Sequence, residues 1–438
     1  MKIILKVAQA KTSAKYLKAG LFLSLILLFF LLLLETGGYL AAGLGLKLKF
    51  SPLYYSRYFN SPSAKFNKAT GYTWVPGENR IMKTMNGELI YDQIFHTNNM
   101  GFTSRRDYSY KRDPDKTLRV LVFGDSFTDS VFLDTPWPDR LQEILDSGEQ
   151  REKKIQIYSF ALDGVGLINW HQTFFNLVLP NFDFDAVIIA SFTGDLIRDF
   201  FVRHINDKQS VYTRLERPPE SEAEFFEDIL PGLKATSWVK DDLYLDHLKQ
   251  VLESEGHWVA LDYDFYITKY LISKWPIIKA RLSYLLQGRN YQEKWHEEHD
   301  PSLNWLAKKE METFSPGNKN HNPWKTDRLK EFFDYFRKNN IPVILSPVPV
   351  REAAIQRNHQ KADMIHQSFI GRLAKEYDFE FFDGYKAFSD QSDEKITNHL
   401  WLKYDGHWGQ NGSDLYAKKL SEYLIENNWP PETAGNLQ

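Results

Sequence analysis

The stretch LRVLVFGDSF at residues 118–127 decides the fold of this 438-residue chain. Its first six residues form a short and nearly continuous apolar run, which is typical of a strand buried on both faces of a parallel sheet. Gly124, Asp125 and Ser126 follow that run directly. A serine at the end of such a strand becomes a nucleophile when a neighbouring base removes its proton.

Further segments repeat this pattern along the chain. Apolar runs recur as KIQIYSF (154–160), DAVIIAS (185–191), IPVILSPV (341–348) and FEFFD (379–383). Amphipathic helical patterns lie at 136–147, 326–340, 366–377 and 412–428. Strands that alternate with helices predict a three-layer α/β/α fold, with a five-stranded parallel sheet between two helical layers.

Two other regions do not show this alternation of strands and helices. Residues 46–115 carry Tyr, Asn, Gly and Pro in irregular order, which favours an extended stalk with short strands. Residues 200–325 are rich in charged and aromatic residues, with helical pieces such as 241–254 and no further sheet signal. We expect a helical insertion there, and our hypothesis is that it covers the main domain as a lid.

The N-terminal region predicts a membrane anchor. Residues 19–34 contain no charge, and together with the mild run at 36–45 they reach the ~20 residues that cross a bilayer. Five lysines and no acid precede them, so the positive-inside rule places the N-terminus in the cytoplasm and the rest outside. A signal peptide cleaved at AAG (41–43) is the alternative, but its apolar core is usually shorter, about 7–15 residues.

These patterns divide the chain into consecutive parts. The expected parts are a cytoplasmic N-terminus (1–18), a transmembrane anchor (19–40), a stalk and N-terminal extension (41–115), the first part of the α/β domain (116–199), the helical insertion (200–325) and the second part of the α/β domain (326–430).

Composition excludes several classes of function. The net charge of −3 gives no electrostatic reason to expect a nucleic acid as partner. Cysteine is absent, which excludes disulfides, thiolate metal sites and cysteine nucleophiles.

Polar residues with catalytic chemistry gather where the predicted strands end. Ligands of an open parallel α/β sheet collect beyond the carboxyl ends of its strands. The segments at that edge are Gly124-Asp125-Ser126, Asp163-Gly164, Thr193-Gly194-Asp195 and, before the last helix, Asp405-Gly406-His407. Serine, histidine and aspartate are the three groups of a nucleophile, its base and the acid that orients the base. Asp125 itself is expected to serve the turn by bonding local backbone.

This arrangement resembles the SGNH, or GDSL-type, hydrolase superfamily over about residues 90–428 apart from the insertion. GDSFTDS (124–130) matches the first block of that family, FALDGVG (160–166) the second and YDGHWGQNG (404–412) the last. The resemblance implies a flavodoxin-like SGNH fold with Ser126 as nucleophile, His407 as general base and Asp405 as its orienting acid. It also implies that the backbone N–H of Gly164 donates to the oxyanion.

Two further segments are similar to the alginate O-acetyltransferase-like branch and to membrane-anchored members. They are the His407-Trp408 pair and HTNNMGFTSRRDY (96–108). The resemblance thus implies an extracytoplasmic serine esterase or O-acyltransferase that acts on acyl esters, especially acetyl groups of envelope or exported polysaccharide. Such an enzyme is expected to need no metal and no cofactor. Its partners would be an acylated carbohydrate and the envelope polysaccharide machinery, and the sequence does not separate hydrolysis from transfer.

The third block departs from the family pattern. The text FTGDL (192–196) carries Asp195 where members usually have an asparagine that donates to the oxyanion. An ionised carboxylate cannot donate a hydrogen bond, and losing one such donor typically costs ~10²–10³ in rate.

Three explanations for Asp195 remain open. Burial keeps Asp195 protonated, or Asn169 or the Thr193 hydroxyl replaces the missing amide, or the site is weak or inactive. If the site is otherwise intact, replacing Asp195 by Asn is expected to raise esterase activity. The alternatives to an enzyme are an impaired SGNH-fold protein that binds glycan and an envelope assembly factor that docks through residues 200–325.

Overall fold

The computed structural model describes most of the chain in separate ranges. They are residues 20–38, 40, 55–60, 62–85, 88–148, 152–206, 210–233, 303–358, 364–403 and 405–431. Two compact units are distinguished. One contains the helix Gly20–Gly38, and the other consists of Ser56–Thr84, Leu89–Ser254 and Gln292–Gln438.

The first unit is described mainly through its apolar helix. Gly20–Gly38 spans 19 residues with a mean hydropathy of 2.3, and only 6% of its most apolar window is buried. A helix of this length and composition can cross a bilayer as an anchor, and a signal sequence has the same properties. Its side chains are almost all exposed in the protein itself, which separates it from a core helix.

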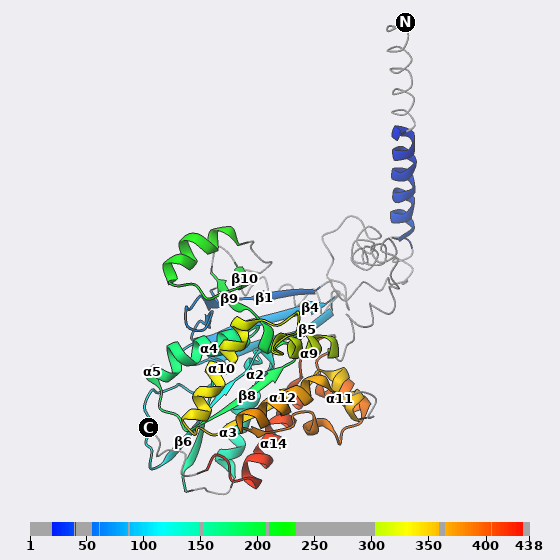
Figure 1. Ribbon diagram of the computed structural model, residues 1–438. Helices are drawn as coiled ribbons and strands as arrows, with labels where there is room; N and C mark the ends of the chain where they lie inside the picture. The colour runs from blue at the N-terminus through cyan, green and yellow to red at the C-terminus, as the bar shows by residue number, and fades with distance from the viewer. Residues whose placement is uncertain are drawn as a thin grey trace. The chain divides into compact units, whose positions relative to one another are not determined.

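The second unit is built on a five-stranded parallel sheet with the order β12-β11-β8-β6-β7. Figure 1 labels its neighbouring strands β6 and β8. Its strands are β6 (Thr117–Phe123), β7 (Lys154–Ser159), β8 (Ala186–Phe192), β11 (Val343–Val348) and β12 (Glu380–Phe381). Every residue of β6 and β11 is buried, as the continuous apolar runs predict. The five predicted strands and their parallel arrangement are therefore confirmed.

Helices cover both faces of this sheet. The main ones are α3 (Trp137–Ser147), α4 (Leu167–Thr173), α10 (Pro323–Lys338), α12 (Ile365–Tyr377) and α14 (Gln410–Glu426). Leu121 and Phe123 of β6 pack in one core with residues of α4, α10 and α12, whereas Val120 and Val122 pack in another with residues of α3 and α14. Alternate residues of one strand thus face two helical layers, and the three-layer fold is confirmed.

Shorter elements complete the α/β part. They are α2 (Ser126–Asp129), η1 (Phe174–Val178), α5 (Leu179–Asn181), η2 (Asp195–Ile197), η3 (Glu224–Ile229), η4 (Leu230–Gly232), α9 (Asn304–Thr313), α11 (Arg351–Asn358), η5 (Lys386–Phe388), α13 (Asp393–Lys395) and η6 (Ile396–Leu400).

The segment expected to be a stalk is folded. It forms β1 (Tyr55–Phe59), β2 (Ala64–Lys65), β3 (Thr73–Trp74), β4 (Gly77–Met85) and β5 (Glu88–Thr97). Strands β1, β4 and β5 make a sheet of their own, which we call the N-terminal sheet. Within this segment, residues 56–84 and 89–115 belong to the same compact unit as the parallel sheet. Aromatic residues of this segment, such as Trp74, Phe95 and Phe102, are buried in the core of that unit. Because irregular stretches separate the strands of the segment, its sequence shows no clear period.

The predicted helical insertion begins with strands. β9 (Phe200–Ile205) and β10 (Ser210–Leu215) form an antiparallel pair that joins β2 and β3 in a four-stranded sheet. The expectation of no further sheet signal within residues 200–325 is therefore wrong. All six residues of β9 are buried, including Arg203 and His204, and these polar residues hide the strand pattern in the sequence. The expected helix at 241–254 lies outside the described residues.

The packing predicts a large loss of stability in Phe332→Ala. This ring is fully buried and lies among Phe123 at 5.6 Å, Phe174 at 5.6 Å and Phe336 at 5.0 Å between ring centroids. Its removal leaves a cavity and should lower the free energy of unfolding by about 3–5 kcal/mol. Denaturant unfolding of the detergent-solubilised full chain measures this loss.

Ile425→Ala is the control, because this side chain of α14 is exposed. It should change the free energy of unfolding by less than about 0.5 kcal/mol. Equal losses in the two variants would contradict the packing described above.

Candidate active site

Ser126 lies at the point where β6 ends and α2 begins. The side chain of Asp125 caps this helix by accepting a hydrogen bond from the Phe127 N–H at 3.0 Å. The turn that Asp125 is expected to serve is therefore present. It presents the Ser126 Oγ to His407, whose Nε2 lies 2.7 Å away.

His407 and Asp405 complete a continuous chain of hydrogen bonds from the serine. The His407 Nδ1 lies 2.5 Å from the Asp405 Oδ1, and the same oxygen accepts the backbone N–H of His407 at 3.0 Å. With its proton on Nδ1, the imidazole leaves Nε2 free to accept the serine proton. The rings of Phe127 and Phe132 pack against the imidazole, with their centroids 4.7 and 4.8 Å from its centroid.

A lysine from the N-terminal sheet contacts Asp405, the last residue in this series of hydrogen bonds. Lys83 of β4 forms an ion pair with the Asp405 Oδ2, the oxygen that His407 does not use. Burial by itself raises the pKa of Asp405, but His407 and Lys83 outweigh it and hold that pKa well below its usual range. Asp405 therefore stays ionised. The sequence analysis missed Lys83, whose single signal is a lone charge within the apolar stretch Ile81-Met82-Lys83.

Two backbone donors are available near the serine. Gly164 has a φ of +88°, and a Cβ there would lie 3.0–3.2 Å from ring carbons of Phe201, so the loop requires glycine. Within the described residues, the N–H groups of Gly164 and Ser126 have no acceptor. They follow β7 and β6, which are neighbours in the sheet. Two free donors at one sheet edge suit a developing oxyanion.

The loop that carries Gly164 is fixed through Asp163. The Asp163 carbonyl accepts the Tyr72 hydroxyl at 2.9 Å, its side chain pairs with Arg203 at 2.7 Å, and its N–H donates to the Asp129 Oδ2 at 2.8 Å. Tyr72 comes from the segment before β3, so the N-terminal region holds the oxyanion loop in place.

Asp195 does not present a donor toward the serine. It is fully buried, its Oδ2 accepts the Phe192 N–H at 2.8 Å, and its Oδ1 lies 2.5 Å from the Arg198 Nη1. The same nitrogen lies 2.9 Å from the Asp125 Oδ2 and donates to the Val165 carbonyl at 2.8 Å. Asp195 thus belongs to a buried Asp–Arg–Asp cluster that ties the third block to the turn of the nucleophile and to the oxyanion loop.

The pKa of Asp195 is raised well above its usual range. Burial is the main cause, and the neighbouring Asp125 adds to it, whereas Arg198 acts in the opposite direction. A single guanidinium between two buried carboxylates compensates one of them fully, so the second holds its proton more strongly. The sequence analysis missed Arg198, which lies three residues after Asp195 and gave no separate signal.

Neither of the proposed substitute donors is available. Both hydrogens of the Asn169 side-chain amide are used, by the carbonyls of Thr70 and Phe201 at 2.9 Å each. The Thr193 hydroxyl interacts with the hydroxyl of Tyr385. The two backbone N–H groups therefore remain the candidate donors for an oxyanion.

This geometry reverses the expected effect of Asp195→Asn. An amide has a single acceptor oxygen, whereas Asp195 turns one oxygen to the Phe192 N–H and the other to Arg198, so one of these two contacts is lost while no donor is gained. We expect about tenfold slower hydrolysis of an activated acetyl ester by the full chain, since small displacements at a nucleophile are costly.

Asp199→Asn is the matched control, because this carboxylate pairs with Lys325 rather than with Arg198. It should leave the rate nearly unchanged. A faster Asp195→Asn variant would show instead that residue 195 reaches the oxyanion.

Asp129 links the nucleophile helix to the N-terminal region. Its Oδ2 accepts the Trp74 Nε1–H at 3.1 Å as well as the Asp163 N–H, and its Oδ1 lies 2.5 Å from the Thr103 Oγ1. Burial raises the pKa of Asp129 to about 7, and the charge of Asp163 adds to it, although the bonds from Thr103 and Trp74 oppose the rise. The Thr103 hydroxyl donates to the carboxylate of Asp129, and on protonation of Asp129 the same pair can bond in the opposite direction.

A raised pKa makes stability depend on pH. The unfolded chain releases the Asp129 proton near pH 4 and the folded chain near pH 7, so stability falls as the pH rises through that window. Asn fits the same partners without a charge, because its amide can donate to Thr103. The wild type should lose about 3–4 kcal/mol of unfolding free energy as the pH rises through this window, and Asp129→Asn should not show that loss.

Unfolding free energies of the wild type and of Asp129→Asn between pH 4.5 and 8 measure this difference. Other buried acids, such as Asp139, contribute equally to both proteins and cancel. Parallel curves for the two proteins would exclude a titrating Asp129.

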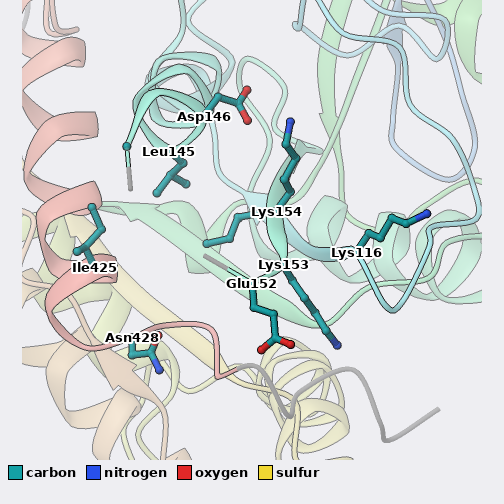
Figure 2. A pocket seen from close by; sticks show the side chains of 10 residues that line it. Lys116, Leu145, Asp146, Glu152, Lys153, Lys154, Ile425 and Asn428 are labelled. Atoms are coloured by element: carbon teal, nitrogen blue, oxygen red, sulfur yellow. The ribbon is translucent and has the colours of Figure 1, made fainter. Parts of the chain in front are cut away.

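A separate cavity lies at the opposite edge of the sheet. Its volume is about 640 Å³, and Figure 2 shows Lys116, Lys153, Lys154 and Ile425 among the side chains that line it. Lys116 precedes β6 and Lys154 begins β7, whereas Ser126 follows the other end of β6. This cavity is therefore remote from the serine and is not part of the candidate active site.

Comparison with known proteins gives a distant likeness in structure. No family model matches the chain, and no curated protein matches it in sequence. A protein named as a GDSL-like lipase from Parabacteroides merdae is 11% identical, with a TM-score of 0.33, over 76% of this chain and 100% of that one.

Two further structures are similar to the same degree. A lipase/acylhydrolase from Enterococcus faecalis is 10% identical with a TM-score of 0.31, over 71% of this chain and 96% of that one. A lipase from a goat rumen metagenome is 13% identical with a TM-score of 0.27, over 73% of this chain and 100% of that one. Such values do not assign an activity, so the argument for function depends on the arrangement of Ser126, His407 and Asp405.

Proposed function

We propose that the chain is a serine esterase or O-acyltransferase of SGNH type, with Ser126, His407 and Asp405 as its triad. The observation that carries this proposal is the unbroken chain of contacts from the Ser126 Oγ to the His407 Nε2 at 2.7 Å and from the His407 Nδ1 to Asp405 at 2.5 Å. A packed histidine without a catalytic role has no reason to join a serine and a buried carboxylate in this order.

The reaction follows from these contacts. His407 takes the Ser126 proton as the Oγ attacks the ester carbonyl, and the N–H groups of Ser126 and Gly164 stabilise the oxyanion. The intermediate collapses when His407 returns the proton to the leaving alcohol, which leaves an acyl group on Ser126. Water, or a second hydroxyl in the case of transfer, then donates its proton to His407 and attacks the acyl carbonyl. The bond between the acyl group and the Ser126 Oγ breaks as His407 returns the proton to that oxygen. Ionised Asp405 stabilises the imidazolium in both halves.

The proposed setting is the outer side of a membrane. The helix Gly20–Gly38 would act as an uncleaved anchor, with the preceding lysines in the cytoplasm and residues 116–199 and 326–430 as the extracytoplasmic catalytic domain. Residues 200–325 would interrupt that domain. The proposed substrates are acyl esters of envelope or exported polysaccharide, and this choice is supported by the resemblance of the His407-Trp408 segment.

Labelling with a fluorophosphonate tests the proposal. This probe bonds only to an activated serine, so the full chain in detergent should be labelled at Ser126, and Ser126→Ala should abolish the label. His407→Ala should slow labelling by about 10³-fold or more, because the hydroxyl loses its base.

Ser130→Ala is the matched control. Ser130 lies on the same short helix turn, but its hydroxyl donates to the Phe127 carbonyl at 2.8 Å and should play no part in labelling. A wild-type chain that resists the probe at every pH would reject the esterase and favour the glycan-binding alternative.

A further inference from the structure

We propose that Lys83 is a positioning residue for the triad, so that a strand outside the α/β domain completes the active site. The proposal rests on the proposed function, because it assigns Lys83 to the same serine chemistry. Lys83 acts through Asp405 and has no assigned contact with substrate.

The first support is the division of partners at Asp405. Its Oδ1 accepts both N–H groups of His407, and its Oδ2 faces the Lys83 ammonium. The side chains of Lys83 and Asp405 are only 9% and 2% exposed. A buried ion pair fixes both partners, because losing either leaves the other charge uncompensated. Lys83 therefore holds the plane of the carboxylate that orients His407.

The second support is a separate contact from the same sheet. Tyr91 of β5 packs against Phe132 with ring centroids 5.6 Å apart, and Phe132 packs against the His407 ring with centroids 4.8 Å apart. Strands β4 and β5 are neighbours, and the pair of Arg80 with Asp92 at 2.9 Å joins them. The N-terminal sheet thus reaches both the acid and the base of the triad.

The positive charge also adjusts the basicity of the site. Asp405 alone would strongly stabilise a protonated imidazole, and the nearby ammonium offsets part of that effect. Within the described residues, His407 and Lys83 are the charged groups with the largest effect on Asp405. Replacing Lys83 by an uncharged residue removes a positive charge that opposes protonation of the neighbouring imidazole.

Lys83→Met tests both effects in the full chain. Loss of the ammonium should move the acid limb of the kcat/KM profile upward by about 0.5–1 pH unit. We expect kcat to fall about tenfold while KM changes little, since no substrate contact is lost. Lys83→Arg keeps the charge and should restore the position of the acid limb.

Arg80→Met is the matched control. It removes another partly buried cation of β4, the partner of Asp92, without touching Asp405. It should lower Tm and leave the acid limb in place. If Lys83→Met also lowers Tm but leaves the acid limb unchanged, Lys83 has a structural role only and the proposal is wrong.

A measurement without turnover separates the two proposals. The ¹⁵N resonances of the His407 ring, assigned by their loss in His407→Gln, follow protonation of the imidazole directly. Their titration midpoint should be higher in Lys83→Met than in the wild type, even if the wild-type chain hydrolyses no ester. An unchanged midpoint overturns the role of Lys83, whereas a shifted midpoint without labelling of Ser126 overturns the proposed function alone.

Discussion

The buried negative charge of Asp405 is the constraint on which this active site depends. An uncompensated carboxylate in such a place costs several kcal/mol, so the fold must supply cations around it. One is the imidazolium that forms during reaction, and the other is Lys83, delivered by a strand of the N-terminal sheet. The buried Asp405 carboxylate is therefore stable only when that sheet and the α/β layers are assembled together.

The same principle explains Asp195. Arg198 lies between Asp195 and Asp125, so two buried carboxyl groups share one buried cation beside Ser126. Arg203 compensates Asp163 next to Gly164 in a comparable way. The three loops around Ser126 are thus held by buried charge pairs, and an amide in place of Asp195 would leave one of them incomplete.

The sequence predicted the parts of the structure that depend on local pattern. The continuous apolar run before Gly124 specifies a strand with two buried faces, and Asp405 with His407 lie two residues apart, so their pairing needs only one turn. It could not predict Lys83, because 322 residues separate it from Asp405 and no period links them. Strand β9 was missed because Arg203 and His204 are buried with partners, and a charge in a sequence is normally taken as exposed.

The N-terminal sheet comes from the part of the sequence that follows the apolar helix Gly20–Gly38, and this order has a consequence for inheritance. A chain that began at β6 would keep Ser126, His407 and Asp405 but lose Lys83, Tyr72 and Trp74, which fix the acid and the oxyanion loop. Residues 56–84 and the α/β layers therefore cannot be exchanged independently, because a substitution at one partner of these contacts requires a matching change at the other.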